Sequence, residues 1–449
     1  MNSQTLTSLS RCVALALLLV SLGNWSVAAD AVVSKPHVVF ILTDDLSAGD
    51  VGCYGGTIAQ TPNIDRLARE GTRFTRYYSV APICSPSRAG LITGQFPARW
   101  RITSYLQTRA GNRACEQADF LDPSAPSLPR ALKSAGYATA HIGKWHLGGG
   151  RDVTNAPKFA AYGYDEGVGT YESPEPHADI TTNWVWSPRD KVKRWNRTAF
   201  FVDRTLDFIA RHKDQPCFVN LWLDDPHTPW VPAPKEGEQS PQGNTRAKLV
   251  RVLEENDRQV GRLMDALPAN TLLIYTADNG ALPTLKHERT LGLRGSKLSL
   301  YEGGIRLPFI ARWPGKVPAG RVDETTVLAA VDLLPTLCAV TGAKSDASSD
   351  GEDLSAALFG TATPRTKPLL WEYGRNADSF KFPEDARHRS PNVAIRDGKW
   401  KLLANADGSN VELYDIIADP NETKSLASDE PDIASRLREA LLNWRRSLP

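Results

Sequence analysis

Short apolar segments alternate along the chain with longer segments in which apolar residues recur at helical spacing. The segments at 37–42, 218–223 and 271–276 are rich in β-branched and aromatic residues and predict buried strands. Helices are predicted at 63–70, 128–135, 198–212 and 248–266. Strands that alternate with helices in this way are typical of an α/β protein, in which a mostly parallel sheet carries helices on both faces.

The last part of the chain has a different pattern. A stretch rich in Gly, Ala, Ser and Asp at 341–353 precedes short apolar segments at 368–373, 393–395 and 400–403. Asp397-Gly398 predicts a hairpin turn, and residues 431–446 predict a final helix. We therefore expect a large domain at 30–362, followed by a small antiparallel α+β domain at 363–449.

The stretch 151–195 is rich in Gly, Pro and aromatic residues and has no clear periodicity, which predicts long irregular loops. Its rings would either form a wall that stacks on a sugar or pack against one another. The residues concerned are Tyr162, Tyr164, Tyr171, His177, Trp184, Trp186 and Trp195.

Polar residues follow the predicted strands directly. Asp44-Asp45 follows the first strand, Asp224 to His227 follow the second, and Asp278-Asn279 follows the third. In an open α/β sheet a site forms beyond the carboxyl ends of the strands. We therefore expect these three segments to converge there.

The N-terminus has the pattern of a secretory signal peptide at 1–29. Arg11 precedes an apolar run at 13–22, and small residues follow at 26–29. The run is short for a membrane span, and no second run of membrane length follows, so we expect no stable membrane insertion. The expected location is secreted or periplasmic, or lysosomal or extracellular in a eukaryotic host.

The composition excludes two classes of protein. With 41% hydrophobic residues and a formal net charge of +2 over 449 residues, the chain is neither disordered nor a basic nucleic-acid binder. Any anionic substrate must therefore be recognised locally, in a site. The oligomeric state is not predicted.

The carboxylates at the strand ends point to a metal. Adjacent carboxylates such as Asp44-Asp45 repel each other unless a cation lies beside them. Asp278 and Asn279 add one carboxylate and one amide oxygen, and an all-oxygen set suits Ca²⁺ or Mg²⁺. The alternative is that each pair caps the turn or helix that follows it.

A second group of side chains is cationic or titratable near neutral pH. Taken singly, a lysine is usually solvated and a histidine is more often structural than catalytic. Together with an oxygen-bound metal they would make a pocket for a tetrahedral anionic ester, with imidazoles available for proton transfer. The group comprises Arg88, Lys144, His146, His227 and Lys297.

The segment Cys84-Ser85-Pro86-Ser87-Arg88, followed by 89–94 ending in Thr-Gly, resembles the signature of the type I sulfatases, and the resemblance extends over nearly all of 30–449. Within that family, which shares the alkaline-phosphatase-like fold, it resembles enzymes of the N-acetylgalactosamine-6-sulfatase and arylsulfatase A type. The resemblance implies that a maturation enzyme oxidises Cys84 to formylglycine. One hydroxyl of the hydrated aldehyde then attacks sulfur, and the other later loses its proton so that sulfate is eliminated.

The resemblance also implies a role for each matching residue. One Ca²⁺ would be bound by the set Asp44, Asp45, Cys84, Asp278 and Asn279. Arg88 would keep the nucleophile ionised, and Lys144 and Lys297 would bind sulfate oxygens. His146 would orient or deprotonate the diol, and His227 would protonate the leaving alcohol. The domain at 30–362 would then be catalytic, and the substrate a sulfated sugar of a polysaccharide or glycosaminoglycan.

Two alternatives stay open at this point. A phosphomonoesterase or phosphonate hydrolase of the same superfamily would share metal-binding strand ends, although the chain lacks the set of histidines that paired Zn²⁺ ions require. A carbohydrate-binding protein would result if Cys84 were never oxidised.

The remaining cysteines carry no predicted chemistry of the site. Cys53 and Cys115 are candidates for a disulfide, whereas Cys217 and Cys338 lie in apolar segments typical of buried thiols.

Overall fold

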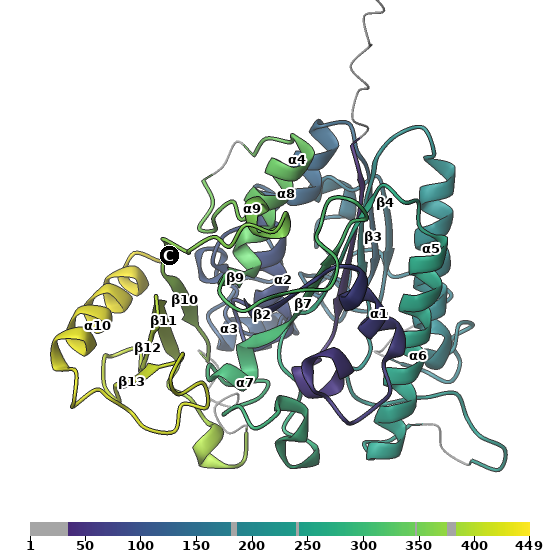
Figure 1. Ribbon diagram of the computed structural model, residues 1–449. Coiled ribbons are helices and arrows are strands. Elements are labelled where there is room, and N and C mark those ends of the chain that lie inside the picture. The colour runs from purple at the N-terminus through teal and green to yellow at the C-terminus, as the bar shows by residue number, and fades with distance from the viewer. Residues whose placement is uncertain (1–34, 181–185, 239–241, 346–347, 375–382) are drawn as a thin grey trace, which may run out of the picture. The chain divides into compact units, whose positions relative to one another are not determined.

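A mostly parallel sheet of nine strands lies at the centre of the part of the chain that the structure describes (Figure 1). The structure is a computed structural model that describes residues 35–180, 186–238, 242–345, 348–374 and 383–449. The strand order is β4-β3-β5-β1-β6-β7-β2-β8, and β9 pairs with β2. The antiparallel pairs are those of β7 with β6 and with β2. The strands are β1 (His37–Thr43), β2 (Thr72–Tyr78), β3 (Ala138–Gly143), β4 (Glu166–Gly169), β5 (Cys217–Trp222), β6 (Thr271–Ala277), β7 (Arg306–Arg312), β8 (Arg321–Asp323) and β9 (Leu328–Ala329).

The middle of the sheet is buried on both faces. Every residue of β3, β5 and β6 is buried, and β1 is buried after its first residue. Parallel strands covered on both faces have near-continuous apolar sequences, because neither face meets water. This explains why the sequence reveals them, and the three predicted strands are confirmed to within one residue at each end.

Helices cover both faces of the sheet, as predicted (Figure 1). α1, α5 and α6 lie on one face and α2, α4 and α8 on the other. The four helices predicted by periodicity, which are α1, α4, α5 and α6, are confirmed to within two residues. The helices are α1 (Pro62–Glu70), α2 (Cys84–Thr93), α3 (Arg109–Ala114), α4 (Leu128–Ser134), α5 (Arg197–Arg211), α6 (Arg246–Ala266), α7 (Glu302–Ile305), α8 (Leu333–Thr341), α9 (Ser355–Leu358) and α10 (Pro431–Arg446).

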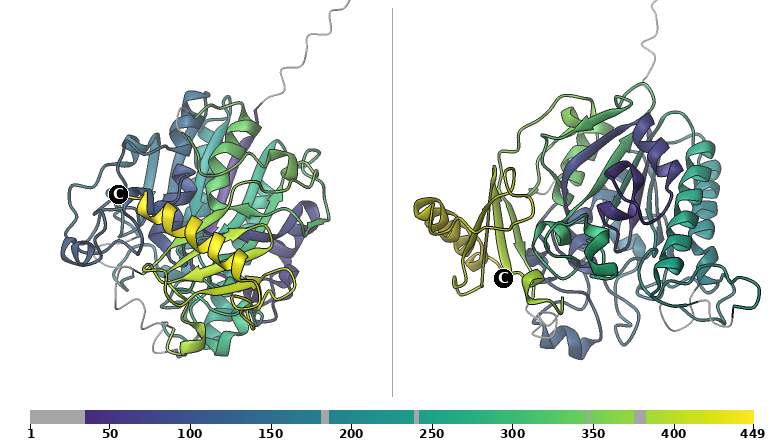
Figure 2. Two further views of the ribbon diagram at one scale, coloured as in Figure 1. Left: turned by 90° about the vertical axis from the view of Figure 1, so that its left-hand side faces the viewer. Right: turned by 60° about the horizontal axis from the view of Figure 1, so that its bottom comes forward.

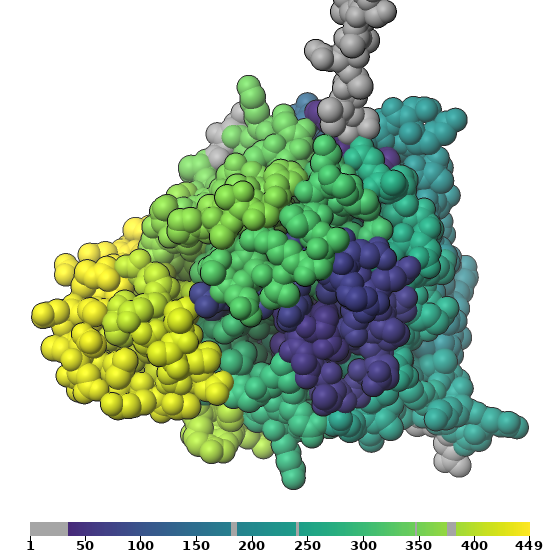
Figure 3. Space-filling model, viewed as in Figure 1, coloured from purple at the N-terminus to yellow at the C-terminus, as the bar shows by residue number. Residues whose placement is uncertain are grey.

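A four-stranded antiparallel sheet follows in the order β10-β11-β12-β13 (Figure 2). Its strands are β10 (Leu369–Glu372), β11 (Val393–Asp397), β12 (Trp400–Ala404) and β13 (Glu412–Asp415). Asp397 pairs with Trp400 across the predicted turn, and α10 packs against β11 and β12. In the space-filling view these residues gather in a lobe at one side of the molecule (Figure 3). The predicted small α+β unit is therefore present.

Buried ion pairs join this lobe to the rest of the fold. The Nζ atom of Lys401 on β12 lies 3.0 Å from Glu302 Oε1 on α7 and 2.9 Å from Glu422 Oε1. The Glu302 backbone N–H donates to Glu422 Oε2 at 2.6 Å, and all three side chains are fully buried. Buried charges are tolerated only when they are paired, and here the pairs connect β12 to α7 and to Glu422.

The described residues of the stretch 151–195 are largely irregular, as predicted, but they include the edge strand β4. That strand escaped prediction because Glu-Gly-Val-Gly has low strand propensity and is stabilised by pairing with β3. The predicted signal peptide at 1–29 and Trp184 lie outside the described residues. Among the residues that are described, no helix combines the length and the apolar character needed to cross a membrane.

Candidate active site

Four neighbouring parallel strands end at the same edge of the sheet, and predicted site residues follow shortly after the end of each. β3 leads to Lys144, β5 to the segment Asp224–His227, β1 to Asp44 and Asp45, and β6 to Asp278. The strand register aligns these ends, since Gly143 and Leu42 both pair with Trp222 and Thr43 pairs with Ala277. The expected convergence of the three segments is thus observed, with Lys144 as a fourth.

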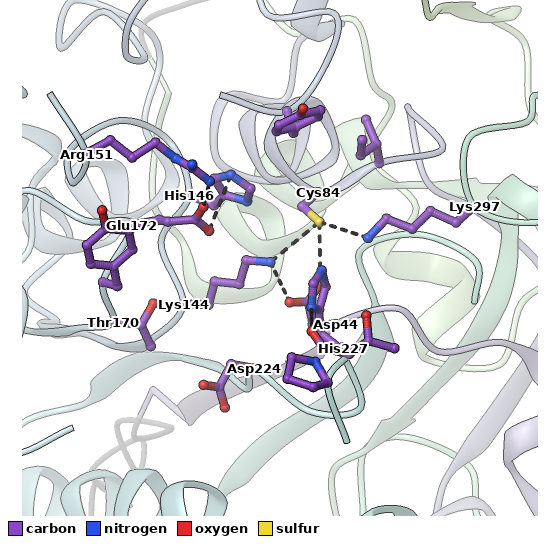
Figure 4. A pocket seen from close by; sticks show the side chains of 15 residues that line it. Asp44, Cys84, Lys144, His146, Arg151, Thr170, Glu172, Asp224, His227 and Lys297 are labelled. Carbon is purple, nitrogen blue, oxygen red and sulfur yellow. Dashed lines mark hydrogen bonds and ion pairs between the residues drawn. The ribbon is translucent and has the colours of Figure 1, made fainter. Parts of the chain in front are cut away.

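Cys84 is the first residue of α2 and lies between two lysines (Figure 4). Its Sγ atom is 3.5 Å from Lys144 Nζ, 3.7 Å from Lys297 Nζ and 3.5 Å from Asp44 Oδ1. Burial and the neighbouring Asp44 raise the pKa of the Cys84 thiol far above its ordinary value, although both lysines oppose this. An unmodified thiol here is protonated at neutral pH and is therefore a poor nucleophile.

Arg88 lies one turn further along α2 and is fully buried. Its Nε and Nη2 atoms donate to Asp278 Oδ2 at 2.9 and 2.7 Å, and its Nη1 atom donates to the Lys144 carbonyl at 2.7 Å. A planar guanidinium can make all these bonds at once, which a lysine cannot. Arg88 therefore ties the end of β6 to the end of β3.

Three carboxylates share the centre of the site with three cationic side chains. Lys144 Nζ lies 2.5 Å from Asp44 Oδ2, and Lys297 Nζ lies 2.6 Å from Asp45 Oδ1. Burial would raise the pKa of Asp44, but Lys144, His227 and Arg88 hold it well below its ordinary value. Burial and Asp44 raise the pKa of Asp278 to about 7 despite Arg88. The formal charges of the three acids and the three cations cancel.

The oxygen atoms at this centre fit a hard divalent cation. Asn279 Nδ2 donates to Asp45 Oδ1 at 2.7 Å, whereas the buried Asn279 Oδ1 has no hydrogen-bond partner among the described residues. Potential ligand atoms of Asp44, Asp45, Cys84 and His227 all lie within 4.8 Å of one another. Carboxylate and amide oxygens are the ligands that Ca²⁺ and Mg²⁺ prefer, so the donor set matches the predicted metal.

His146 lies on the side of the cavity near Lys144 (Figure 4). Its Nε2 atom is 3.1 Å from the Leu106 carbonyl, which accepts only if Nε2 carries the proton. Its buried Nδ1 atom then has a free lone pair and has no partner among the described residues. Burial lowers the pKa of His146 to about 3, while the neighbouring Glu172 acts to raise it.

Glu172 and Arg151 form a wall beside His146 that sequence reasoning missed. Glu172 Oε1 accepts from Arg151 Nη2 at 2.6 Å, and Glu172 Oε2 lies 3.5 Å from His146 Nε2. Burial would raise the pKa of Glu172, but His146, Lys144 and Arg151 lower it to about 2, so it is ionised. Both residues belong to the aperiodic stretch 151–195, where no strand was predicted, so no sequence pattern pointed to either of them.

His227 faces the Asp45 carboxylate from the loop after β5. Its Nε2 atom lies 3.7 Å from Asp45 Oδ2, and its side chain is one quarter exposed. Burial lowers the pKa of His227, although Asp45 and Asp44 act to raise it. The structure thus brings all the predicted site residues together around Cys84.

A cavity of about 370 Å³ opens onto this centre. Tyr171 from the stretch 151–195 lines this cavity, and so does Tyr105 from an earlier part of the chain. Tyr162 and Tyr164 are buried and pack with Trp145 in the core, and His177 packs on Phe200. The prediction that rings form a wall for a sugar is therefore wrong for Tyr162, Tyr164 and His177. The alternative, that they pack against other residues of the protein, is correct for these three.

Cys53 and Cys115 do not form a disulfide with each other.

Comparisons with known proteins agree on one family. Residues 36–343 match the family described as Sulfatase, and residues 296–447 match N-sulphoglucosamine sulphohydrolase, C-terminal. An N-acetylgalactosamine-6-O-sulfatase of Bacteroides thetaiotaomicron is 28% identical, over 91% of this chain and 92% of the relative. Human arylsulfatase A is 31% identical, over 90% of this chain and 81% of the relative.

Solved structures show the same fold. A protein crystallised with k-i-k-neocarrahexaose superposes with a TM-score of 0.73 and 25% identity, over 92% of this chain and 93% of that one. A phosphonate monoester hydrolase of Agrobacterium radiobacter superposes with a TM-score of 0.65, over 92% and 96% of the two chains. At 21% identity this second likeness is one of fold alone.

Proposed function

Because the chain belongs to the sulfatase family and is a sulfuric ester hydrolase, we propose that it releases sulfate from sulfated sugars, with formylglycine made from Cys84 as the nucleophile. The observation that carries this proposal is the position of Cys84. It begins a buried helix between Lys144 and Lys297, beside three carboxylates, in a state in which its own thiol is protonated. Such a setting suits an anionic ester better than a reactive thiolate.

Formylglycine at residue 84 would supply a hydrated aldehyde, one hydroxyl of which attacks sulfur. Lys144 and Lys297 reach Cys84 from opposite sides and would bind two sulfate oxygens. Arg88 would hold Asp278 and the start of α2 in place. His227 would give a proton to the oxygen of the departing alcohol. Nδ1 of His146 would accept the proton of the second hydroxyl, which restores the aldehyde and releases sulfate.

Ca²⁺ would be held by Asp44, Asp45, Asp278 and Asn279 together with residue 84, and would offset negative charge that builds up on the nucleophile and the sulfate. Lys144 and Lys297 pair with Asp44 and Asp45 in the structure. With the metal beside these carboxylates, both ammonium groups can turn to the substrate. Lys144 and Lys297 would therefore pair with the carboxylates when no metal is bound, and bind sulfate oxygens when it is.

The relatives and the cavity support one substrate class. The Bacteroides relative is an N-acetylgalactosamine-6-O-sulfatase, and one structural neighbour was crystallised with an oligosaccharide. A cavity of about 370 Å³ is at the small end of the range for ligand sites, which favours one sulfated sugar ring at the end of a chain. We propose action on a sulfated polysaccharide or glycosaminoglycan, in the secreted or periplasmic space, after a maturation enzyme has oxidised Cys84.

The two alternative functions have less support. The likeness to a phosphonate hydrolase extends to the fold alone, whereas sulfatases match in sequence along most of the chain. A protein that only binds carbohydrate would not need Lys144, His146, His227 and Lys297 around one thiol.

Mass spectrometry of the peptide that contains Cys84, combined with a sulfate-release assay, tests the proposal. We expect an aldehyde in place of the thiol in active protein, and complete loss of release in Cys84→Ala. Cys338→Ala is the matched control, because that thiol is also buried but lies on α8. Full activity with an unmodified Cys84 thiol would contradict the mechanism. Sugars sulfated at the 2-, 4-, 6- or N-position then define the substrate.

A further inference from the structure

The segment that carries His227 has no regular secondary structure of its own. Residues 224–229 follow β5 as an irregular loop with cis peptide bonds before Pro226 and Pro229. His227 itself makes a short-range contact, in which its Nδ1 atom lies 2.6 Å from the Thr228 carbonyl. The position of the imidazole relative to the cavity must therefore depend on contacts from outside the loop.

Arg194 supplies such contacts from the short 3-10 helix Arg194–Asn196, which directly precedes α5. Its Nη2 atom donates to Asp225 Oδ1 at 2.8 Å, to the His227 carbonyl at 3.4 Å and to the Asp224 carbonyl. Its Nη1 atom forms an ion pair with Asp224 Oδ2. One guanidinium thus binds three of the four residues of the segment 224–227.

Arg194 and its two acidic partners are buried. Arg194 is 1% exposed, and Asp224 and Asp225 are 4% and 7% exposed. Removing charged groups from water is costly, and a hydrophobic replacement of similar volume is often at least as stable. A buried ion-pair cluster is therefore weak evidence of a role in stability and is better explained by the geometry that it imposes.

We propose that Arg194 is a positioning residue that holds the loop 224–227 so that His227 can protonate the leaving alcohol. This inference rests on the proposed role of His227. It predicts a defect that depends on the leaving group. A sugar alkoxide is a poor leaving group and needs the proton, whereas a nitrophenolate is stable enough to depart without one.

Arg197 offers a matched control within the same buried cluster. It is fully buried, and its Nη1 and Nη2 atoms donate to Asp224 Oδ2 at 2.8 Å and to Asp190 Oδ2 at 2.9 Å. Arg194, in contrast, binds the His227 carbonyl itself. A lysine at either position keeps the charge but loses the planar fork.

The test compares Arg194→Lys, Arg197→Lys and His227→Ala on a 6-sulfated N-acetylgalactosamine and on 4-nitrophenyl sulfate. We expect Arg194→Lys to lower kcat on the sugar by about 10- to 100-fold with little change on the aryl ester, in the same direction as His227→Ala. Arg197→Lys should affect both substrates equally. In the double variant Arg194→Lys/His227→Ala, the first change should have no further effect on the sugar.

The outcomes separate the two proposals. If His227→Ala discriminates between the substrates but Arg194→Lys lowers both rates equally, Arg194 is merely structural and the inference is overturned. If His227→Ala itself does not discriminate, the role of His227 fails and the inference fails with it. Asp225→Asn serves if Arg194→Lys does not fold, since it removes one anchor of Arg194 without changing the shape of the side chain. Asp225→Asn should lower kcat on the sugar selectively, but by less than Arg194→Lys. Equal losses of kcat on both substrates would again overturn the inference.

Discussion

Glu172 Oε2 lies 3.5 Å from His146 Nε2, on the same side of the imidazole as the Leu106 carbonyl that accepts the Nε2 proton. The carboxylate therefore stabilises His146 when it becomes positively charged, while Nδ1 stays available to take up a proton. This pairing resembles a carboxylate that orients a catalytic histidine in a triad.

Glu172→Gln should slow the second half of the reaction. Without the carboxylate, a protonated His146 is less stable, so removal of the proton that releases sulfate slows down. We expect kcat to fall by about 10- to 100-fold on sugar and aryl sulfates alike, with a burst of released alcohol in the first turnover. Glu175→Gln, in the same loop but more exposed, should leave kcat unchanged. Loss of activity without a burst would place Glu172 in another step.

Calcium should stabilise the protein through the strand-end carboxylates. At about 100 times its Kd, the ion would raise the free energy of unfolding by about 2.7 kcal/mol. Thermal unfolding with Ca²⁺, Mg²⁺ and a chelator measures this shift, and Asp45→Asn should reduce it because Asp45 is one of the proposed ligands. An identical Tm in all three conditions would contradict the metal site.

The buried pair of Glu422 and Glu302 should make stability depend on pH. Burial and the charge of Glu302 raise the pKa of Glu422 from 4.5 to about 7, despite Lys401. The folded state therefore keeps a proton that the unfolded chain loses, so the free energy of unfolding falls as the pH rises from 4.5 to 7.

Glu422→Gln, which mimics the protonated acid, should remove the contribution of Glu422 to the pH dependence of the free energy of unfolding. That contribution is at most about 1.4 kcal/mol per pH unit. Denaturant unfolding of both proteins at pH 5, 6 and 7, with Ca²⁺ saturating, provides the comparison. Parallel pH profiles for the two proteins would show that Glu422 does not titrate in this range.

Gly143 allows β3 to pass close to β5 just before Lys144. Its φ is +117°, and a Cβ atom at this position would lie 1.8 Å from the Trp222 carbonyl oxygen. Gly143→Ala should therefore cost more than about 4 kcal/mol in the free energy of unfolding.

Gly136→Ala is its control, because it also has a positive φ, of +91°, but no atom lies within 4 Å of the added methyl group. There the cost should be only about 1–2 kcal/mol. Denaturant melts of the two variants give the difference, and equal costs would show that strain alone, and not the clash with Trp222, governs position 143.

The sequence alone determined the α/β fold, the three apolar central strands and the polar residues at their ends. Parallel strands of one sheet end at one edge, so Asp44, Asp45, Asp278 and the segment 224–227 had to meet once the strands were recognised. The local motif around Cys84 identified the family, because it depends on consecutive residues and not on distant contacts.

The tertiary structure alone decided the positions of Arg151, Glu172 and Arg194. All three lie in the aperiodic stretch 151–195, which contacts distant partners such as β3, Arg109 and the loop 224–227. A local pattern carries no record of such contacts. The local sequence also could not show that Tyr162 and Tyr164 belong to the core. The same loop sequence is compatible with a ring that packs inward and with a ring that faces a ligand.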